Sequence, residues 1–417
     1  MLVIEGRAYL EGQLESVALG IEDGTIVAIK KTLRGDKTYR FGDAILLPGG
    51  IDVHVHFREP GKTHTEDFAS GTESAAVGGV TTVVDMPNTR PPVTKGDVLR
   101  EKLRVVSRHA NVDFGLYGAP ASAADVKSLA DAIAYKVYLA ETTDAPLIRD
   151  DAALADLLAG VASTKTYVSV HAEDPGRFQS LPAKNLEDYH RARPPEAEKS
   201  AIETVGRLRG EARVHIAHVT TAEAVKARPA GATCEVTPHH LLLSTASPIG
   251  ARGKVNPPLR PIAERDNLWR EVVAGSVDMF ASDHAPHTLD EKSVPFDEAP
   301  AGVPGVATTF PVLFRYVRRD VLPLPQFVAM FSENPAKLLR VNKGTLAVGR
   351  DADLIVVDPR RIEKMTARRC RYKCGWTPFE GAESTFPFAT FVRGQLVSQE
   401  GELVTESVGR LITPSEL

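Results

Sequence analysis

Two histidines one residue apart, His54 and His56, stand at the end of a short apolar run and are followed at once by Arg58. In a β-strand alternate side chains project to the same face, so both imidazoles are directed toward one point. This arrangement predicts a metal site, because imidazole is a common zinc ligand. The alternative is that both histidines are polar residues satisfied by hydrogen bonds in a barrel core. Ligands elsewhere in the chain must decide between the two.

Groups that can bind a metal also occur in four later apolar runs, at or near their ends. They are Lys136, His171, His218 and Asp283. In the run that ends at His218, alternation places His215 on the opposite face, so we expect His215 to be structural. Four histidines and an aspartate can hold one zinc ion with ligands to spare, or two divalent ions if a further group bridges them.

Lys136 is the unusual member of this set, because metal ions repel a protonated amine. One interpretation is an ion pair, or a side chain that extends toward solvent at the end of the barrel. The other is that burial and nearby cations favour the neutral amine, which takes up carbon dioxide to give a bridging carbamate. Asp144, Asp150 and Asp151 are rival bridging carboxylates. With two ions about 4 Å apart, Asp283 would bind one ion and carry a proton from water to the leaving amide nitrogen.

These residues must be positioned by alternating strands and helices. Eight apolar β-type runs are recognisable, at 51–56, 81–85, 112–117, 134–139, 167–171, 213–218, 233–237 and 279–283. Helical patterns lie between most of them, for instance at 97–106, where Leu99, Leu103 and Val106 share a face. Eight βα units predict a (β/α)₈ TIM-type barrel, with catalytic groups at the carboxyl ends of the strands. A doubly wound sheet is the alternative, but no glycine-rich dinucleotide fingerprint follows the first run.

Both ends of the chain contain short strand-like runs separated by turns. We expect residues 1–45 and 345–417 to form one small β domain, because chain ends often lie close together. Residues 46–344 are then the metal-dependent barrel. Insertions rich in proline and glycine at 175–195 and 285–306 are predicted to be loops over the active site, since long ordered loops are usually functional.

The composition is that of an ordinary globular protein, with 43% hydrophobic residues, 25% charged residues and a formal net charge of −4. This charge does not indicate nucleic acid or a membrane as partner, so we expect a small-molecule substrate. We also expect no targeting or membrane-spanning segment. The three cysteines, Cys234, Cys370 and Cys374, argue for a reducing, cytoplasmic compartment, with a Cys370–Cys374 pair left open.

Six ordered motifs together resemble the dihydroorotases of the amidohydrolase superfamily over nearly the whole chain. They are HVHFREPG (54–61), DMPNT (85–89), KVYL (136–139), VHAE (170–173), NPPLR (256–260) and SDHAPH (282–287). The resemblance implies reversible cyclisation of N-carbamoyl-L-aspartate to L-dihydroorotate in de novo pyrimidine synthesis. It also implies two Zn²⁺ ions per subunit, one bound by His54, His56 and Asp283, the other by His171 and His218, and both by N6-carboxylated Lys136.

The chain departs from the pattern of its relatives in one loop. Many free-standing bacterial relatives use an aspartate as the bridging ligand, whereas the lysine context here resembles the dihydroorotase domain of the animal multifunctional protein. In that relative an aromatic residue follows the Glu-Thr of an active-site loop, but here Thr143 follows Glu141 and Thr142, and the behaviour of this loop is left open. The insert at 189–195 resembles the bacterial version of its loop.

The choice among cyclic amides depends on substrate charge, because the superfamily also contains hydantoinases and allantoinases. Dihydroorotate carries a carboxylate, which the guanidinium of Arg58 can bind in a bidentate manner, and Asn88 and His287 can add donors. Each has a structural alternative, since Arg58 can pair with Glu59 or Asp67, Asn88 can be a turn residue and His287 a loop residue. The resemblance adds weaker substrate contacts at Asn256, Ala301 and Gly302.

Two further interpretations concern metal binding and activity. His239 and His240, close to Cys234, suggest another metal pair, but adjacent side chains diverge on a strand, so we expect both to support other groups. Dihydroorotase-like chains can also serve as non-catalytic scaffolds for aspartate transcarbamoylase, and such chains usually lose metal ligands. All six candidate ligands are present here, so we expect an active enzyme. The sequence leaves open a homo-oligomer or an association with aspartate transcarbamoylase.

Overall fold

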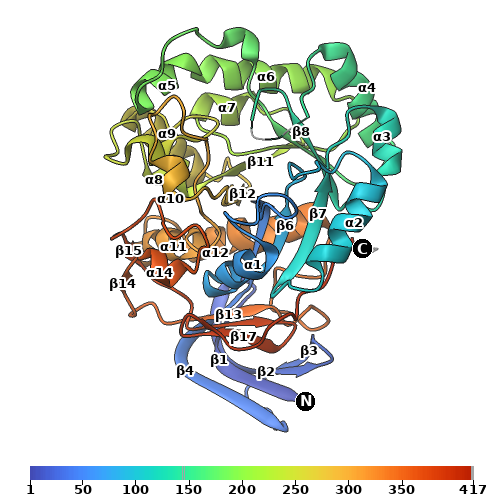
Figure 1. Ribbon diagram of the computed structural model, residues 1–417. Helices are drawn as coiled ribbons and strands as arrows, with labels where there is room; N and C mark the ends of the chain where they lie inside the picture. Colours follow the sequence, from blue (N-terminus) through green and yellow to red (C-terminus); the bar gives the residue numbers. More distant parts are fainter. Residues whose placement is uncertain (143, 145, 415–417) are drawn as a thin grey trace.

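The computed structural model describes residues 1–142, 144 and 146–414 (Figure 1). Within this part of the chain, eight parallel strands form a barrel in sequence order. They are β5 (Gly50–Val55), β6 (Val80–Asp85), β7 (Asp113–Gly118), β8 (Ala134–Tyr138), β9 (Val168–His171), β10 (Val214–Ile216), β11 (Thr233–Val236) and β12 (Met279–Phe280). Each predicted run overlaps one of these strands, so the predicted barrel is confirmed. A parallel bridge between Val55 and His284 brings the first and last strands together.

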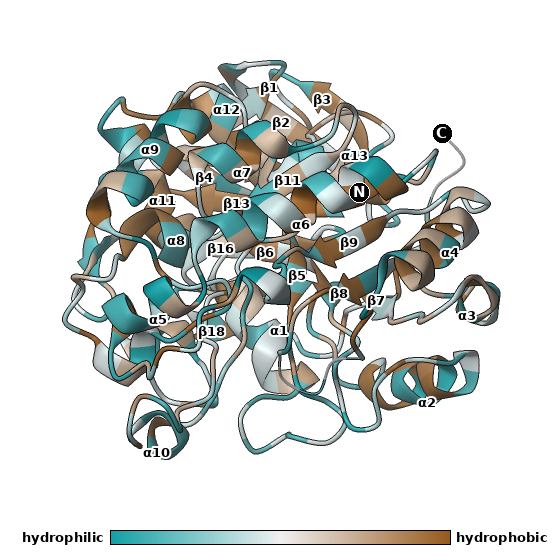
Figure 2. Cartoon of the chain, turned by 90° about the horizontal axis from the view of Figure 1, so that it is seen from above, coloured by the Kyte–Doolittle hydropathy of each residue, from teal (hydrophilic) through white to brown (hydrophobic). Residues whose placement is uncertain are grey.

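Helices follow the strands and cover the outside of the barrel (Figure 2). The covering helices are α1 (Phe68–Val77), α2 (Gly96–Val106), α3 (Ala123–Ser128), α4 (Asp151–Ala162), α6 (Pro195–Leu208), α7 (Ala222–Ala227), α9 (Ile262–Val273) and α11 (Thr309–Arg318). Helix α2 matches the pattern predicted at 97–106 and buries Leu99 and Val106. Such amphipathic helices gain stability by packing their apolar stripe against the strands.

Short helical turns lie in the loops and after the barrel. They are η1 (Pro175–Arg177), α5 (Leu186–Ala192), α8 (Pro238–Leu242), η2 (Gly250–Gly253), α10 (Leu289–Lys292), α12 (Leu324–Val328), η3 (Ala329–Glu333) and α13 (Asn334–Leu339). The two predicted insertions contain η1 and α5 in one case and α10 in the other. None of the helices in the described ranges is long and apolar enough to cross a membrane.

A second eight-stranded sheet is built from both ends of the chain, as predicted. Its strands are β1 (Leu2–Leu10), β2 (Gln13–Glu22), β3 (Thr25–Lys30), β4 (Lys37–Pro48), β13 (Leu354–Val357), β16 (Ala389–Val392), β17 (Gln395–Gln399) and β18 (Glu402–Leu403). Strand β4 joins the two ends, because it pairs in parallel with β1 and antiparallel with β13. The domain boundaries at 45/46 and 344/345 stay a prediction.

Part of the C-terminal segment leaves this sheet and packs on the barrel. It carries β14 (Glu363–Lys364), α14 (Ala367–Cys370) and β15 (Glu383–Ser384). The hydroxyl of Tyr372 accepts a hydrogen bond from Ala307 N at 2.9 Å, and Trp376 Nε1 donates one to His287 O at 2.7 Å. Near the end of the chain, Leu411 forms a parallel bridge with Phe114 of β7. The C-terminal residues therefore also contact the barrel and its loops.

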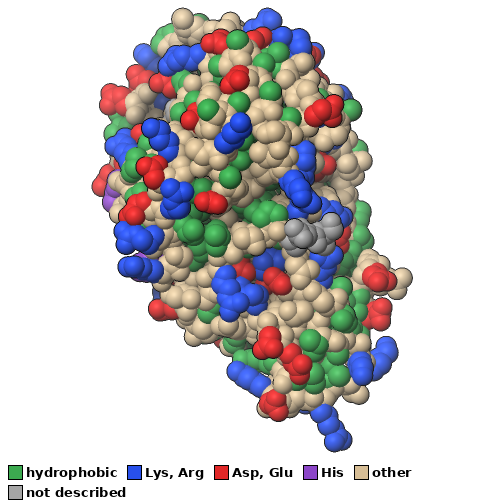
Figure 3. Space-filling model, turned by 90° about the vertical axis from the view of Figure 1, so that its right-hand side faces the viewer, with side chains coloured by type: hydrophobic (Ala, Val, Ile, Leu, Met, Phe, Trp, Pro, Cys, Tyr) green, Lys and Arg blue, Asp and Glu red, His purple; other side chains and the backbone are tan. Residues whose placement is uncertain are grey.

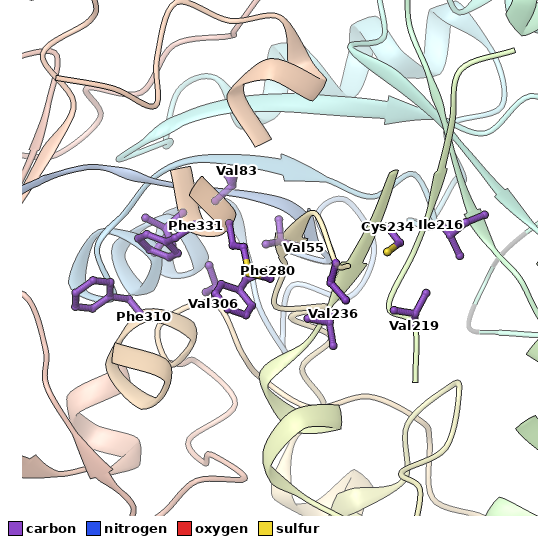
Figure 4. Close-up of a cluster of buried hydrophobic side chains, with 14 of the residues drawn as sticks. Val55, Val83, Ile216, Val219, Cys234, Val236, Phe280, Val306, Phe310 and Phe331 are labelled. Atoms are coloured by element: carbon purple, nitrogen blue, oxygen red, sulfur yellow. The ribbon is translucent and has the colours of Figure 1, made fainter. Parts of the chain in front are cut away.

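The main apolar core lies between the strands and the surrounding helices. Val55 and Val83 from β5 and β6 gather there with Phe280, Phe310 and Phe331 (Figure 4). Because Val55 faces this outer layer, its neighbours His54 and His56 are directed to the other side of β5, as strand alternation predicts. On the face shown in Figure 3, basic and acidic side chains are interspersed, in keeping with the small net charge.

A buried charge cluster joins the barrel to the terminal sheet. Lys343 Nζ lies 2.7 Å from carboxylate oxygens of both Asp113 on β7 and Asp353 before β13, and 3.0 Å from Asp351. Lys343, Asp113 and Asp353 are all at least 95% buried. Removal of the amine would therefore leave two buried carboxylates without their shared cation.

Replacing Lys343 by methionine is expected to lower the free energy of unfolding by about 3–5 kcal/mol, the cost of breaking a buried ion pair from one side. Urea unfolding followed by circular dichroism measures this change. The matched control is Lys337→Met, because Lys337 is exposed and its ion pair with Glu333 is 3.9 Å long. Equal unfolding midpoints for the two variants would contradict the prediction.

Candidate active site

Two histidines and an aspartate meet where the first and last barrel strands adjoin. His54 Nε2 lies 3.2 Å and His56 Nε2 3.0 Å from the same oxygen, Asp283 Oδ1. One ligand atom from each of the three residues lies within 4.8 Å of the others. The Val55–His284 bridge explains this meeting, because it aligns the end of β5 with the chain that leaves β12. Histidines from one strand end and the aspartate from another therefore form a group that could hold a metal ion.

A second pair of histidines adjoins this group. His171, at the end of β9, has its Nδ1 3.1 Å from His218 Nε2, just beyond β10. The ring of His218 lies 5.3 Å from the ring of His54, measured between centroids. Burial lowers the pKa of both His171 and His218, so both rings are neutral at pH 7. Neutral imidazole is the form that binds a metal.

The outward nitrogen of three of these rings is occupied by an acceptor. His54 Nδ1 contacts Glu235 Oε1, His56 Nδ1 lies 2.7 Å from Asn88 Oδ1, and His171 Nε2 lies 2.8 Å from Glu173 Oε2. An acceptor at that nitrogen can hold the ring proton there when a metal ion is present, and the other nitrogen of each ring, which faces the cluster, can then present its lone pair to the ion. This pattern is typical of metal-binding histidines.

Lys136 lies beside the two histidine pairs in β8. Its side chain is 1% exposed, and its closest polar contact is Ser169 Oγ at 3.5 Å. Lys136 makes no ion pair with any described residue, so neither the predicted ion pair nor the solvent-directed side chain is what the structure contains. Burial lowers the pKa of Lys136 to about 8. Burial also lowers the pKa of His171 and His218, and the charge of Lys136 adds a smaller effect in the same direction.

The rival bridging carboxylates are engaged elsewhere. Asp144 forms ion pairs with Lys62 at 2.7 Å and Arg90 at 2.9 Å. Asp150 is the exposed N-cap residue of α4, and Asp151 is exposed in the first turn of the same helix. Of the nearby loop residues singled out in the sequence, Thr143 lies outside the described residues.

Arg58 is buried next to this cluster, on the loop that leaves β5. Its side chain is 97% buried and makes no ion pair with any described residue. Its Nη2 lies 3.5 Å from His287 Nε2, and its Nε has no hydrogen-bond partner in the described part of the chain. The structural alternatives are not realised, because Glu59 accepts a hydrogen bond from Phe68 N and Asp67 pairs with Lys373. The Arg58 guanidinium can therefore pair with an anion from outside the protein, such as a substrate carboxylate.

Three residues at this end of the barrel have left-handed backbone angles. The φ values are +62° at Arg58, +37° at His218 and +44° at Asp283. Such angles are strained for residues with a Cβ, and they persist where the surrounding structure holds them. Strain at three candidate site residues is typical of a functional site.

The loop after β12 brings His287 and the backbone at 301–302 to the same place. His287 Nε2 lies 3.1 Å from Ala301 O, and burial, with a further effect of Arg58, lowers the pKa of His287 to about 2. Gly302 has a φ of +139°, and a Cβ there would lie 2.4 Å from Ala285 O, so only glycine fits. The buried Nζ of Lys292 holds this loop by donating hydrogen bonds to the carbonyl oxygens of Lys254, Pro300 and Gly302, at 3.2, 2.8 and 3.1 Å respectively.

Of four other histidine and asparagine positions near the site, three have defined hydrogen-bond partners. His215 contacts Glu235 Oε2 at 2.9 Å and Thr233 Oγ1 at 2.8 Å, and His240 contacts Thr237 and the carbonyl of Pro257. Both ring nitrogens of each are therefore used by the protein. His239 Nε2 is buried and has no partner in the described residues. Asn256 Oδ1 accepts a hydrogen bond from Tyr189 OH at 2.5 Å.

Sequence reasoning missed the two glutamates that hold the histidines. Glu235 and Glu173 are fully buried, which is rare for a carboxylate without a partner. The available signal was their place, since Glu235 interrupts an apolar strand and Glu173 follows His171 by two residues. Asn88 was predicted to serve the substrate, and the structure shows that its oxygen also holds His56.

Comparison with known proteins identifies the family of this chain. The sequence profile of the Amidohydrolase family matches residues 45–397. A dihydroorotase of Halobacterium salinarum is 41% identical over 98% of this chain and 99% of its own length, and one of Methanosarcina acetivorans is 38% identical over 95% and 91%. The solved L-hydantoinase of Arthrobacter aurescens is similar with a TM-score of 0.92 at 29% identity, covering 99% of both chains. The chain therefore belongs to the Amidohydrolase family, and within it to the dihydroorotases.

Proposed function

We propose that this dihydroorotase interconverts N-carbamoyl-L-aspartate and L-dihydroorotate at a site that holds two zinc ions. The observation that carries the substrate assignment is the buried Arg58, which lies against His287 and forms no ion pair with any described residue. A buried guanidinium is costly unless a carboxylate pairs with it, and the substrate brings one. Full-length similarity to dihydroorotases supports the same assignment.

The donor set fits the proposed ions. His54, His56 and Asp283 would hold one ion, and His171 and His218 would hold the other. Lys136, as a carbamate, would bind both ions. The fit is supported by the lone pairs that face the cluster and by the lowered pKa of Lys136, because the neutral amine is the form that reacts with carbon dioxide. When bound, the ions would acidify a water molecule and polarise the amide carbonyl.

Asp283 is the proposed proton carrier. Burial alone would raise the pKa of Asp283, but the adjacent His54 and His56 hold this pKa well below its usual range. The carboxylate is therefore ionised at pH 7 and can accept a proton from water during ring opening. It then returns this proton to the leaving amide nitrogen, and in ring closure the proton moves in the opposite direction.

Arg58 and the loop at 287–302 are proposed to orient the substrate. Arg58 binds the carboxylate, and Asn88, Asn256, His287 and the backbone of residues 301–302 surround the ring. Neutral His287 can donate or accept one hydrogen bond at a fixed nitrogen, because its pKa is about 2. These contacts hold the amide carbon near the proton carrier Asp283.

The experiment combines metal analysis with substrate comparison. Protein purified without chelators should contain two zinc ions per chain and should turn over dihydroorotate far faster than hydantoin or allantoin. Mass spectrometry in bicarbonate buffer should find a carboxylated lysine at position 136. Absence of zinc together with no turnover after zinc addition would overturn the enzyme assignment, and preference for hydantoin would overturn the substrate assignment.

We further propose a cytoplasmic location. The support is that Cys234, Cys370 and Cys374 are all free and buried. Free thiols throughout the described chain are typical of reducing compartments. An association with a second copy or with aspartate transcarbamoylase stays a prediction, which size-exclusion chromatography with light scattering would test.

Replacing Lys292 by methionine is expected to raise KM for dihydroorotate about tenfold, because the lost hydrogen bonds to backbone carbonyls release the loop at 300–302, and each such bond is worth about 1 kcal/mol. Steady-state kinetics measure the effect, with kcat expected to change less than KM. The exposed Lys127, replaced in the same way, is the control. An unchanged KM in a folded Lys292 variant would refute this role.

A further inference from the structure

The insertion between β9 and α6 supports the candidate metal ligand His171 on the side of the ring that faces away from the metal cluster. Glu173 Oε2 accepts from His171 Nε2 at 2.8 Å, and Arg193, after α5, donates to both oxygens of Glu173, with 3.1 Å between Nε and Oε1. Glu173 is fully buried and Arg193 is 92% buried. A bidentate arginine–carboxylate pair fixes both partners in one plane, so the direction of the His171 ring depends on the position of Arg193.

The same arginine also reaches a candidate substrate ligand. Its Nη1 lies 3.4 Å from the hydroxyl oxygen of Tyr189 on α5, and this hydroxyl donates to Asn256 Oδ1 at 2.5 Å. Because Tyr189 OH takes the oxygen of the Asn256 amide, the amide nitrogen of Asn256 is left as the group that can face a substrate. A continuous path of hydrogen bonds thus runs from His171 through Arg193 to Asn256.

Arg193 is itself held by two further contacts. Its guanidinium lies over the ring of Phe178, 4.5 Å from the centroid, and its carbonyl accepts from Arg260 Nη1 at 2.7 Å. Arg260 is 98% buried and also donates to Thr220 Oγ1 at 2.9 Å. The insertion is therefore anchored on the barrel, and Arg193 can transmit that fixed position to the groups around it.

We propose that Arg193 is a positioning residue that sets the direction of His171 toward the second metal ion and, through Tyr189, the direction of the Asn256 amide toward the substrate. The proposal rests on the proposed function. It assigns a role to the insertion at 175–195, which the motifs around the metal ligands do not explain. The side chain of Arg193 would then position both a candidate metal ligand, His171, and a candidate substrate ligand, Asn256.

Two variants separate the two branches of this path. Arg193→Met removes both, so zinc retention against a chelator should fall about 10- to 100-fold, the range for lost partners of metal ligands, and KM for dihydroorotate should rise. Tyr189→Phe removes only the hydroxyl, so KM should rise several-fold while zinc retention equals that of the wild type. The control is Arg191→Met, because Arg191 lies on α5 with Tyr189, is exposed and pairs only with Asp188 in the described structure.

A double-mutant cycle tests the Tyr189 branch. If Tyr189 acts through Asn256, Tyr189→Phe should add little to the rise in KM caused by Asn256→Ala, whereas independent residues would give additive effects. Additive effects, or an Arg193→Met protein with the zinc retention and KM of Arg191→Met, would overturn the proposal. Should Arg193→Met fail to fold, the cycle still tests the Tyr189 branch, and Arg193→Lys, which keeps the charge but not the bidentate geometry, tests the His171 branch. Zinc retention equal to that of Arg191→Met in the Arg193→Lys protein would overturn the proposal. A wild-type protein without zinc or dihydroorotate turnover would instead overturn the proposed function.

Discussion

Replacing Asp283 by asparagine is expected to lower kcat for dihydroorotate about 10³-fold, within the usual contribution of a general acid–base group. The amide keeps the size of the side chain and one oxygen near His54 and His56, but it cannot accept a proton from water at pH 7. The loss should appear in both directions of the reaction, because the same carboxylate carries the proton each way.

The measurement is steady-state turnover of dihydroorotate and of N-carbamoyl-L-aspartate, with zinc content determined on the same samples. Asp131→Asn is the control, because Asp131 is exposed and its only ion pair in the described chain is a 3.9 Å contact with Arg100. If the Asp283 variant kept its zinc and more than a tenth of wild-type kcat, Asp283 would not be the proton carrier.

Replacing Arg58 by alanine is expected to raise KM for dihydroorotate about 100-fold or more, since hydrogen bonds to a charged group are worth about 1.5–3 kcal/mol each. The buried guanidinium has no carboxylate partner in the described structure, so its loss should affect substrate binding more than folding. Arg58→Lys keeps the charge but not the planar fork, and an intermediate KM is expected.

Thermal unfolding of the Arg58 variants separates binding from stability. Arg104→Ala is the matched control, because Arg104 is exposed and pairs with Glu101 on the same helix. A KM for Arg58→Ala that equals the wild-type value would remove Arg58 from the substrate site and return the choice between dihydroorotate and uncharged cyclic amides to an open question.

The barrel and its strand ends could be predicted because both depend on local patterns. Each apolar run of five or six residues overlaps a strand, and alternation along the first run correctly directs His54 away from Val55. The rule that barrel chemistry lies at the carboxyl ends of strands then selected His171, His218 and Asp283 from a chain with 12 histidines and 54 acidic residues.

The partners of these residues could not be predicted in the same way. Glu235 is 181 residues from His54 in the sequence, and Arg193 is 20 residues from Glu173 across an insertion with its own helix. Likewise, the contact of Trp376 with the carbonyl of His287 joins residues 89 positions apart, and the prediction of a small β domain from both chain ends did not include it. No periodicity encodes such contacts, because they depend on how separate elements pack.

Residue types and their alternation along strands therefore sufficed to indicate which side chains end the barrel strands and what chemistry they can perform. Closure of the barrel decided how far apart these side chains lie and which partners they have. It brought Asp283 within 3.2 Å of both His54 and His56, left Arg58 buried without an ion pair to any residue that the structure describes, and engaged the rival aspartates elsewhere. The physical reason is that side-chain direction follows from local backbone geometry, whereas distance between remote residues is set only when the strands form one closed sheet.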